Sequence, residues 1–78
     1  MPLYRYYFFD VDGGVRDTRA IENRNDSAAV ERAHYFLANQ IENIAIEIWR
    51  GQGFVKGVRR DGSTYGSGPR PVRPSVSG

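Results

Sequence analysis

Two closely spaced carboxylates are the first residues of this chain that invite chemistry. Asp10 and Asp12 follow an aromatic run and precede two glycines, in the order Phe8-Phe9-Asp10-Val11-Asp12-Gly13-Gly14. An apolar strand that ends in such a pair can present one carboxylate as a nucleophile and the other as a general acid or base. The same string is also typical of a tight turn between two strands.

The aspartate pair resembles the first motif of haloacid-dehalogenase-type phosphatases, and the resemblance would make Asp10 the nucleophile and Asp12 the acid-base. Gly14 stands where that family has Thr or Val, and 78 residues are too few for its large sheet. No later lysine and acidic pair can be assigned, because the only lysine, Lys56, falls in a predicted strand. A phosphoryl transition state would therefore lack its charge stabilisation. A calcium loop does not fit either, since Ile21 stands where a bidentate glutamate belongs.

The remaining polar residues form no catalytic or metal-binding pattern. His34 is the only histidine, the chain has no cysteine, and no serine or threonine has a nearby base with a second orienting group. We therefore predict a protein that is not an enzyme, with no catalytic, cofactor-binding or metal-binding residues and no cofactor. The aspartate string is interpreted as a hairpin turn.

Two β-type segments open the chain. Residues 4–10 are dominated by aromatic residues with high strand preference, and residues 15–21 alternate weakly and carry three charges, as expected of an exposed or edge strand. The glycines between these segments predict a β-hairpin, with either Asp12-Gly13 or Gly13-Gly14 as its loop.

A single segment with helical spacing follows, from Asp26 to Ile41. Asn25 is placed to cap its N-terminus, and Asp26 puts a negative charge in the first turn, at the positive end of the helix dipole. Its apolar stripe consists of Val30, Ala33, Leu37 and Ile41, flanked by Ala29 and Phe36. One face of this helix is expected to pack on a sheet and the other to be solvated.

The best-specified strand pairing lies after the helix. Ile44, Ile46 and Ile48 alternate with other residue types, and Gly51-Gln52 offers a two-residue loop into a second apolar run. That loop sets three cross-strand pairs, which are Trp49 with Phe54, Ile48 with Val55, and Glu47 with Lys56. The aliphatic face of this hairpin then covers the helix stripe, and the aromatic pair falls on the opposite side of the sheet.

These segments predict an α+β domain of ββαββ order over residues 1–61, in which a mostly antiparallel sheet packs one helix on one face. In residues 62–78, four glycines, four serines and three prolines make up eleven of 17 residues. We expect a disordered tail there, because so few apolar groups cannot offset the entropy of ordering. Residues 1–61 contain nine basic and nine acidic residues, so the formal charge of +2 comes from Arg70 and Arg73 in the tail.

An aromatic pair without obvious cover favours a role in binding other proteins. A domain of about 60 residues buries only about 60% of its unfolded surface, so association would stabilise it. The candidate interaction surface consists of Trp49, Phe54, Arg50 and Lys56. We predict a non-enzymatic interaction or regulatory module whose partner is a second copy, as a dimer, or another protein. In the alternative reading, both rings fold over the sheet edge or lie under the tail.

Weak binding of single-stranded nucleic acid is the second functional hypothesis. Aromatic strand residues are interspersed with basic residues, and such rings can stack on bases while basic side chains contact phosphates. The rings are Tyr4, Tyr6, Tyr7, Phe8, Trp49 and Phe54, and the basic residues are Arg5, Arg50, Lys56, Arg59 and Arg60. The candidate contacts are Arg59 and Arg60. The glycine-flanked aromatic signature of an RNA-recognition motif is absent from the sequence, and the charge balance of residues 1–61 disfavours this partner.

Four segments of the chain resemble a family of small uncharacterised bacterial proteins. They are residues 1–8, the turn at Asp12-Gly13, residues 29–33 and above all residues 45–51. Family members share the succession Tyr-x-Phe/Tyr-Tyr, Asp-Gly, Ala-x-Glu-Arg-Ala and Ala-Ile-Glu-Val-Trp. The resemblance implies a cytoplasmic bacterial protein and brings no known activity, ligand or catalytic residue. No apolar run approaches the ~20 residues of a membrane helix, and the opening lacks the basic start of a secretory signal.

Overall fold

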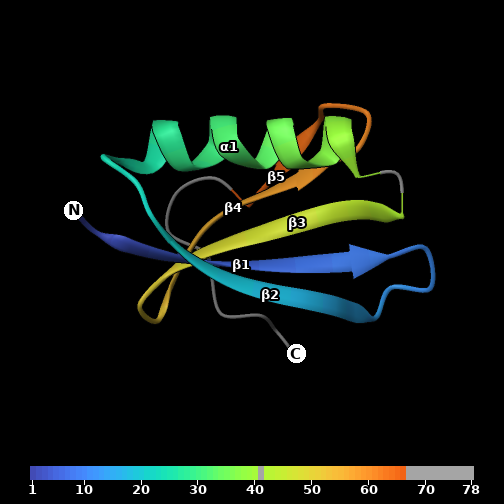
Figure 1. The fold of residues 1–78 in the computed structure, drawn as a ribbon, viewed down its shortest axis with the longest axis horizontal. Coiled ribbons are helices and arrows are strands. Elements are labelled where there is room, and N and C mark those ends of the chain that lie inside the picture. The colour runs from blue at the N-terminus through green and yellow to red at the C-terminus, as the bar shows by residue number, and fades with distance from the viewer. Residues whose placement is uncertain (41, 67–78) are drawn as a thin grey trace.

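The computed structural model describes residues 1–40 and 42–66, in which one helix lies across one face of an antiparallel sheet (Figure 1). The elements in chain order are β1 (Leu3–Asp10), β2 (Val15–Glu22), α1 (Asp26–Asn39), β3 (Asn43–Arg50), β4 (Gly53–Arg59) and β5 (Thr64–Tyr65). The strands lie in the order β2-β1-β3-β4-β5, and every neighbouring pair is antiparallel. The predicted α+β class is confirmed, and the ββαββ order holds with a short fifth strand added at one edge.

Helix α1 begins where its capping residue predicted. The Oδ1 atom of Asn25 accepts a hydrogen bond from the Ala28 N–H at 2.9 Å, and the extended backbone of Asn25 marks it as the N-cap. Asp26 lies in the first turn, where its charge meets the N-terminal end of the helix dipole. Local sequence therefore sets the start of the helix.

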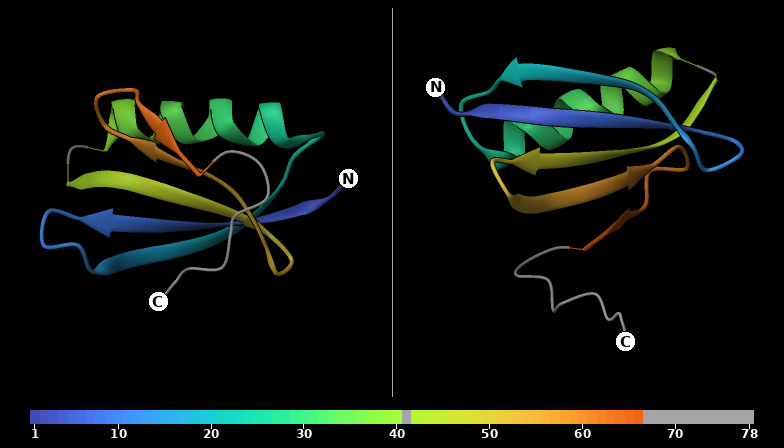
Figure 2. Two further views of the ribbon diagram at one scale, coloured as in Figure 1. Left: turned by 180° about the vertical axis from the view of Figure 1, so that it is seen from behind. Right: turned by 90° about the horizontal axis from the view of Figure 1, so that it is seen from below.

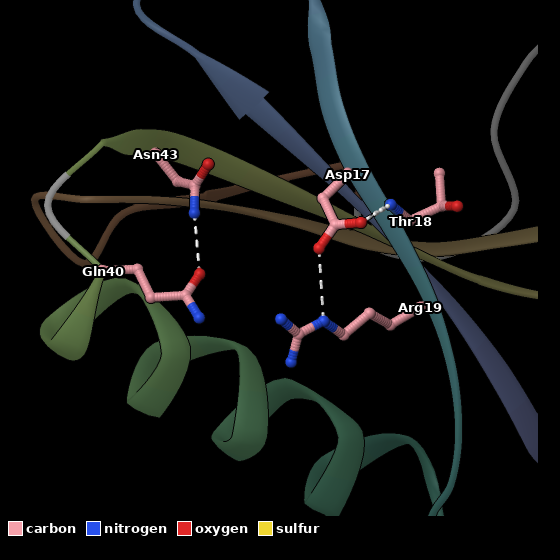
Figure 3. Close-up of polar contacts among 5 residues, drawn as sticks. All are labelled: Asp17, Thr18, Arg19, Gln40 and Asn43. Carbon is pink, nitrogen blue, oxygen red and sulfur yellow. Dashed lines mark hydrogen bonds and ion pairs between the residues drawn. The ribbon is translucent and has the colours of Figure 1, made fainter.

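The other end of α1 is held by a residue distant in sequence. The helix ends at Asn39, and the Arg60 guanidinium donates to the Leu37 carbonyl at 2.8 Å and to the carbonyls of Gln40 and Asn43. Figure 3 shows the side chain of Gln40 accepting a hydrogen bond from Asn43 Nδ2, at 2.8 Å, across the connection to β3. Arg60 supplies donors to carbonyls that a helix end leaves without internal partners.

The core lies between α1 and the sheet and combines large side chains from the strands with small ones from the helix. Small helix residues let α1 approach the sheet closely, and the space between the layers is filled by the rings of β1. The buried core residues are Tyr4, Tyr6, Phe8, Ala29, Ala33, Leu37, Ile46, Ile48 and Val58. The predicted helix stripe is confirmed at Ala29, Ala33 and Leu37, with Val30 and Phe36 packed against it, whereas Ile41 lies outside the described residues.

A buried polar network ties β1 to the helix beneath this apolar layer. The Tyr6 hydroxyl donates to the Ala29 carbonyl at 2.9 Å and accepts from Asn23 Nδ2 at 3.0 Å. The Asn23 Oδ1 atom accepts in turn from Arg32 Nε at 3.0 Å. The phenol oxygen of Tyr6 therefore both donates and accepts a hydrogen bond, which offsets the cost of burying it.

An arginine from the edge strand β2 extends the covered side of the sheet. The Arg19 guanidinium lies 5.6 Å from the ring centre of Phe8 and 5.8 Å from that of Phe36. Its Nε also pairs with Asp17 Oδ2 at 3.3 Å, and Figure 3 shows both side chains directed to the helix side of β2. The helix side of the sheet is thus covered by α1 and by charged side chains at its edge.

A β-bulge between β1 and β3 changes one expected core residue. The pairing passes from Phe9 with Ala45 to Asp10 with Asn43, so Ile44 is the extra residue. Ile44 is 40% exposed, and its predicted place on the buried aliphatic face is wrong. A bulge adds one residue to one strand and breaks the strict alternation on which that prediction rested.

A second bulge lies in the β3–β4 hairpin. Its two-residue loop at Gly51-Gln52 and its Trp49–Phe54 pair are confirmed. Two further predicted pairs are wrong, because the structure pairs Ile48 with Lys56 and Glu47 with Gly57 in place of Ile48 with Val55 and Glu47 with Lys56. Val55 is the extra residue, and it packs against the core from the margin.

The first hairpin uses a longer loop than either of the two predicted. Residues 11–14 connect the strands, and Asp10 donates its backbone N–H to the Gly14 carbonyl at 3.0 Å. The Asp10 Oδ1 atom accepts from the N–H groups of Asp12 at 3.0 Å and Gly14 at 3.2 Å. Gly13 has a φ of 84°, a conformation that favours glycine. The Asp10 carboxylate therefore organises the turn, as the hairpin interpretation requires.

Strand β5 lies within the segment whose composition predicted a tail. It pairs with Gly57 and Val58 after a turn in which the Asp61 carboxylate accepts from the Ser63 hydroxyl at 2.7 Å and from its N–H at 2.9 Å. These hydrogen bonds hold the pKa of Asp61 below its usual range. The rest of the predicted tail, residues 67–78, lies outside the described residues. Within the described part, no helix is long and apolar enough to cross a membrane.

Candidate interaction face

The sheet has a second face that no other described element covers. The right-hand view of Figure 2, from below, looks onto the strands with α1 behind them. Side chains alternate along β1 and β3, so the neighbours of the buried core residues point to this face. We call it the aromatic face, after its five partly buried rings Tyr7, Phe9, Trp49, Phe54 and Tyr65.

Three of these rings form a continuous row over β3, β4 and β5. Trp49 and Phe54 contact edge to face with ring centres 5.2 Å apart, and Phe54 lies 6.2 Å from Tyr65 in a tilted arrangement. Both separations fall in the range of favourable aromatic pairs. The aromatic contact predicted for the second hairpin is therefore present and extends to a ring from β5.

Gly57 permits Tyr65 to lie directly on the sheet. The two residues are partners across β4 and β5, and a Cβ atom built on Gly57 would come within 2.0 Å of the Tyr65 ring. Because Gly57 has no side chain, its backbone would be open to water, and the ring of Tyr65 covers it. The glycine and the tyrosine therefore act as a pair that a substitution at either position would disturb.

Glu47 occupies the centre of the aromatic face, and its carboxylate is held from two sides. Trp49 Nε1 donates to Glu47 Oε1 at 3.4 Å, and the Tyr65 hydroxyl donates to Oε2 at 3.1 Å. Tyr7 is the cross-strand partner of Glu47 on β1. A carboxylate positioned in this way is a fixed negative charge among aromatic rings.

A shallow hollow lies over β2, β1 and β3 on this face. It has a volume of about 290 Å³ and is lined by Tyr7, Phe9, Val15, Glu47 and Trp49. Three aromatic rings and one carboxylate meet in it. This combination suits an organic cation, because ring faces and carboxylates both attract positive charge.

The structure separates the four residues of the predicted interaction surface. Trp49 and Phe54 lie together on the aromatic face, as predicted. Arg50 lies on the helix side, with Nη1 3.6 Å from Asp26 Oδ1 and its guanidinium 5.9 Å from the Tyr4 ring centre. Lys56, the partner of Ile48, also lies on the helix side.

Lys56 contributes to a groove between α1 and β4. The groove has a volume of about 500 Å³, and its polar lining combines Asp26, Ser27, Glu31, His34 and Lys56. The two carboxylates lie on α1 and Lys56 lies on β4, so the groove carries both signs of charge. His34, the only histidine of the chain, lines this groove from α1.

The two arginines proposed as nucleic-acid contacts lie in different environments. Arg59 stacks on Tyr65, with its guanidinium 4.5 Å from the ring centre, and its Nη1 donates to Ser63 Oγ at 3.3 Å. Arg60 instead supports the end of α1. Only Arg59 therefore borders the aromatic face.

The aspartate pair lies at the first hairpin turn, with Asp10 at the end of β1 and Asp12 in the loop. Among the described residues, no three His, Cys, Asp or Glu side chains gather in a way that would hold a metal ion. The sequence interpretation missed Tyr7, Phe9, Glu47 and Tyr65 as members of one face. Strict alternation in residues 4–10 could have assigned the first two, whereas Tyr65 required knowledge of β5.

Comparisons with protein-family models, with curated proteins and with solved structures each give no match. The resemblance to a family of small bacterial proteins therefore stays a prediction from the quoted segments.

Proposed function

We propose that this protein is a non-enzymatic interaction module that associates with a second copy of itself through the aromatic face. The observation that carries the proposal is the set of five rings on a sheet face that no other described element covers. Large contiguous apolar patches on soluble domains commonly mark contact surfaces. Tyrosine, tryptophan and phenylalanine are the side chains enriched in such contacts.

The dimensions of the molecule are compatible with a stable contact. Its extents are 35 × 33 × 20 Å, so the sheet presents a broad face for its mass. A standard interface needs about 800 Å² per partner, and a face of this breadth can supply it. Association would also bury apolar surface that a two-layer domain of this size leaves open to water.

The positions of the rings and charges in the described residues support a protein partner over single-stranded nucleic acid. Three of the rings counted for base stacking, Tyr4, Tyr6 and Phe8, are fully buried in the core. Of the basic residues counted with them, Arg50 and Lys56 lie on the helix side and Arg60 supports the helix end, which leaves Arg5 and Arg59 at the aromatic face. The aromatic face itself carries Glu47 near its centre, which would repel phosphate.

Measurement of the oligomeric state tests the proposal. We expect the full chain to form dimers at micromolar concentration in light scattering or sedimentation velocity. Trp49→Ala and Tyr7→Ala should shift the population to monomer, because each removes a ring from the aromatic face. The matched control is Tyr35→Ala, since Tyr35 is a 65% exposed ring on the helix.

The outcomes separate the two functional hypotheses. A strict monomer in which Trp49→Ala changes nothing but solubility defeats the proposal. Binding of a single-stranded oligonucleotide at about 50 mM salt, lost as salt rises, would favour the alternative instead. That binding should weaken with Arg59→Ala if the alternative is right, because Arg59 borders the aromatic face.

A further inference from the structure

The hollow on the aromatic face has the composition of a cation-binding site. Its wall includes the rings of Tyr7, Phe9 and Trp49, and the Glu47 carboxylate lies in it. Aromatic rings attract cations through the negative face of the ring, and a carboxylate adds a full charge. A volume of about 290 Å³ is just below the roughly 300–1,000 Å³ of small-molecule pockets, which suits a side chain more than a cofactor.

The Glu47 carboxylate keeps acceptor capacity for such a cation. It accepts one hydrogen bond from Trp49 and one from Tyr65. An ionised carboxylate offers about four lone-pair sites on its two oxygens and can accept a bidentate guanidinium. These two donors fix the orientation of the Glu47 carboxylate before a ligand binds, which lowers the entropic cost of binding.

Arg5 is the cation on this face that lacks a described partner. It is exposed on β1 opposite Trp49, and its guanidinium makes no hydrogen bond, ion pair or ring contact with any described residue. Arg59, by contrast, already stacks on Tyr65. The aromatic face therefore carries a carboxylate with spare acceptors and an arginine with spare donors.

We propose that the hollow of each copy binds the Arg5 guanidinium of a second copy, placing it over the rings and against Glu47. This inference rests on the proposed function and names the residues that set the geometry of the dimer. Arg5 pairs with Trp49 and Glu47 with Tyr7, so Arg5 and Glu47 are diagonal neighbours on β1 and β3. Diagonal neighbours lie about 7–8 Å apart.

This spacing matches the symmetry of a dimer. In a two-fold interface, residue i of one copy contacts residue j of the other, and the reverse contact forms as well. A two-fold axis between the faces that bisects the line from Arg5 to Glu47 carries each arginine onto the other copy's carboxylate. The two contacts then form together, and the charges of the two faces cancel.

A charge-exchange experiment tests the pairing. In R5E both positions are acidic, and in E47R both are basic. We expect each variant alone to dimerise at least about tenfold more weakly than the wild type, because close interfacial charge pairs couple by at least that factor. An equimolar mixture of R5E and E47R restores both attractive contacts, and we expect its dissociation constant to return to within about threefold of the wild-type value.

A matched control and a second readout complete the design. R24E makes the same charge change at an exposed residue before α1, and it should dimerise like the wild type. Because Trp49 is the only tryptophan, its fluorescence reports on the hollow directly. Addition of Nα-acetyl-arginine amide should change this fluorescence in the monomeric R5E variant and should do so less in R5E/E47Q.

The results distinguish this inference from the proposed function. If Trp49→Ala yields monomers while R5E and E47R dimerise like the wild type, the aromatic face is the interface and the Arg5 pairing is wrong. If each variant is weakened but their mixture is not restored, the pairing is also wrong. A monomeric wild type that binds Nα-acetyl-arginine amide through Glu47 would overturn the second copy as the occupant.

Discussion

The two faces of the sheet are built from the same strands and similar residues, yet they differ in what surrounds them. Tyr6 and Tyr7 are adjacent on β1, and only Tyr6 is buried beneath α1. On the helix side the phenols reach acceptors inside the fold. On the aromatic face the rings surround a charged group that faces outward. The comparison shows that residue type alone does not decide between core and contact surface.

The hydroxyl groups of the two faces also differ in their hydrogen-bond partners. The Tyr4 hydroxyl donates to Asp26 Oδ1 at 2.6 Å, and the Tyr6 hydroxyl to the Ala29 carbonyl. Burial raises the pKa of both phenols, and the Asp26 carboxylate raises that of Tyr4 further. Both phenol protons are therefore kept for hydrogen bonds that join β1 to α1. The Tyr65 hydroxyl instead orients Glu47, a group with capacity for further contacts.

The largest expected difference between the faces comes from truncating adjacent tyrosines. Tyr6→Ala should lower the free energy of unfolding by about 3–5 kcal/mol, since it removes a buried ring and one of the hydrogen-bond partners of the Asn23 amide. This loss is comparable with the whole stability of a small domain. Tyr7→Ala should remain folded and lose dimerisation. Urea unfolding of both variants checks this, and equal destabilisation would remove the distinction between the faces.

Adjacent arginines offer a second comparison. Arg60→Ala should destabilise the fold by about 2 kcal/mol, because it removes donors from the carbonyls at the end of α1. Arg59→Ala should cost about 0.5–1 kcal/mol, the range for an exposed stack of a cation on a ring. Thermal unfolding followed by circular dichroism measures both. The reverse order of the two effects would contradict the assignment of Arg60 to the helix end.

Alkaline pH should destabilise the fold through the two buried phenols of the covered face. Tyr4 and Tyr6 have folded pKa values above the ordinary value of 10.0, so the folded state keeps protons that the unfolded state releases. Their contribution to stability is complete below pH 10 and is lost as the pH rises through the folded values. Urea midpoints at about pH 9 and pH 11 should show this loss. Tyr6→Phe should reduce the loss, because it removes one of these two phenols.

A methyl group beneath Tyr65 is expected to have a local effect on β5. Gly57→Ala should displace the ring of Tyr65 and break its hydrogen bond to Glu47, at a cost of about 1 kcal/mol. Faster amide exchange in β5 and altered Trp49 fluorescence would report the displacement. Gly53→Ala is the control, because its added Cβ would meet the Arg50 carbonyl at an ordinary 3.5 Å. Identical behaviour of the two variants would show that Tyr65 does not need the glycine.

Local sequence was enough to predict the elements that depend on neighbouring residues. The N-cap at Asn25, the loop at Gly51-Gln52 and the burial of Ala33 and Leu37 all follow from propensity, capping and helical spacing. The same reasoning placed Trp49 and Phe54 on the side of the sheet away from the helix. These features require only interactions a few residues apart or a two-residue turn.

The candidate site was predicted only in part, because its assembly depends on pairings between distant strands. The bulges at Ile44 and Val55 shift the register by one residue, and the sequence carries no separate mark for them. The separation of Lys56 from Glu47 follows from the second bulge. The sequence by itself therefore determined the helix, the hairpins and the fold class through local preferences. The tertiary structure decided which rings share the aromatic face with Glu47, since strand order and register bring together residues that are far apart in the chain.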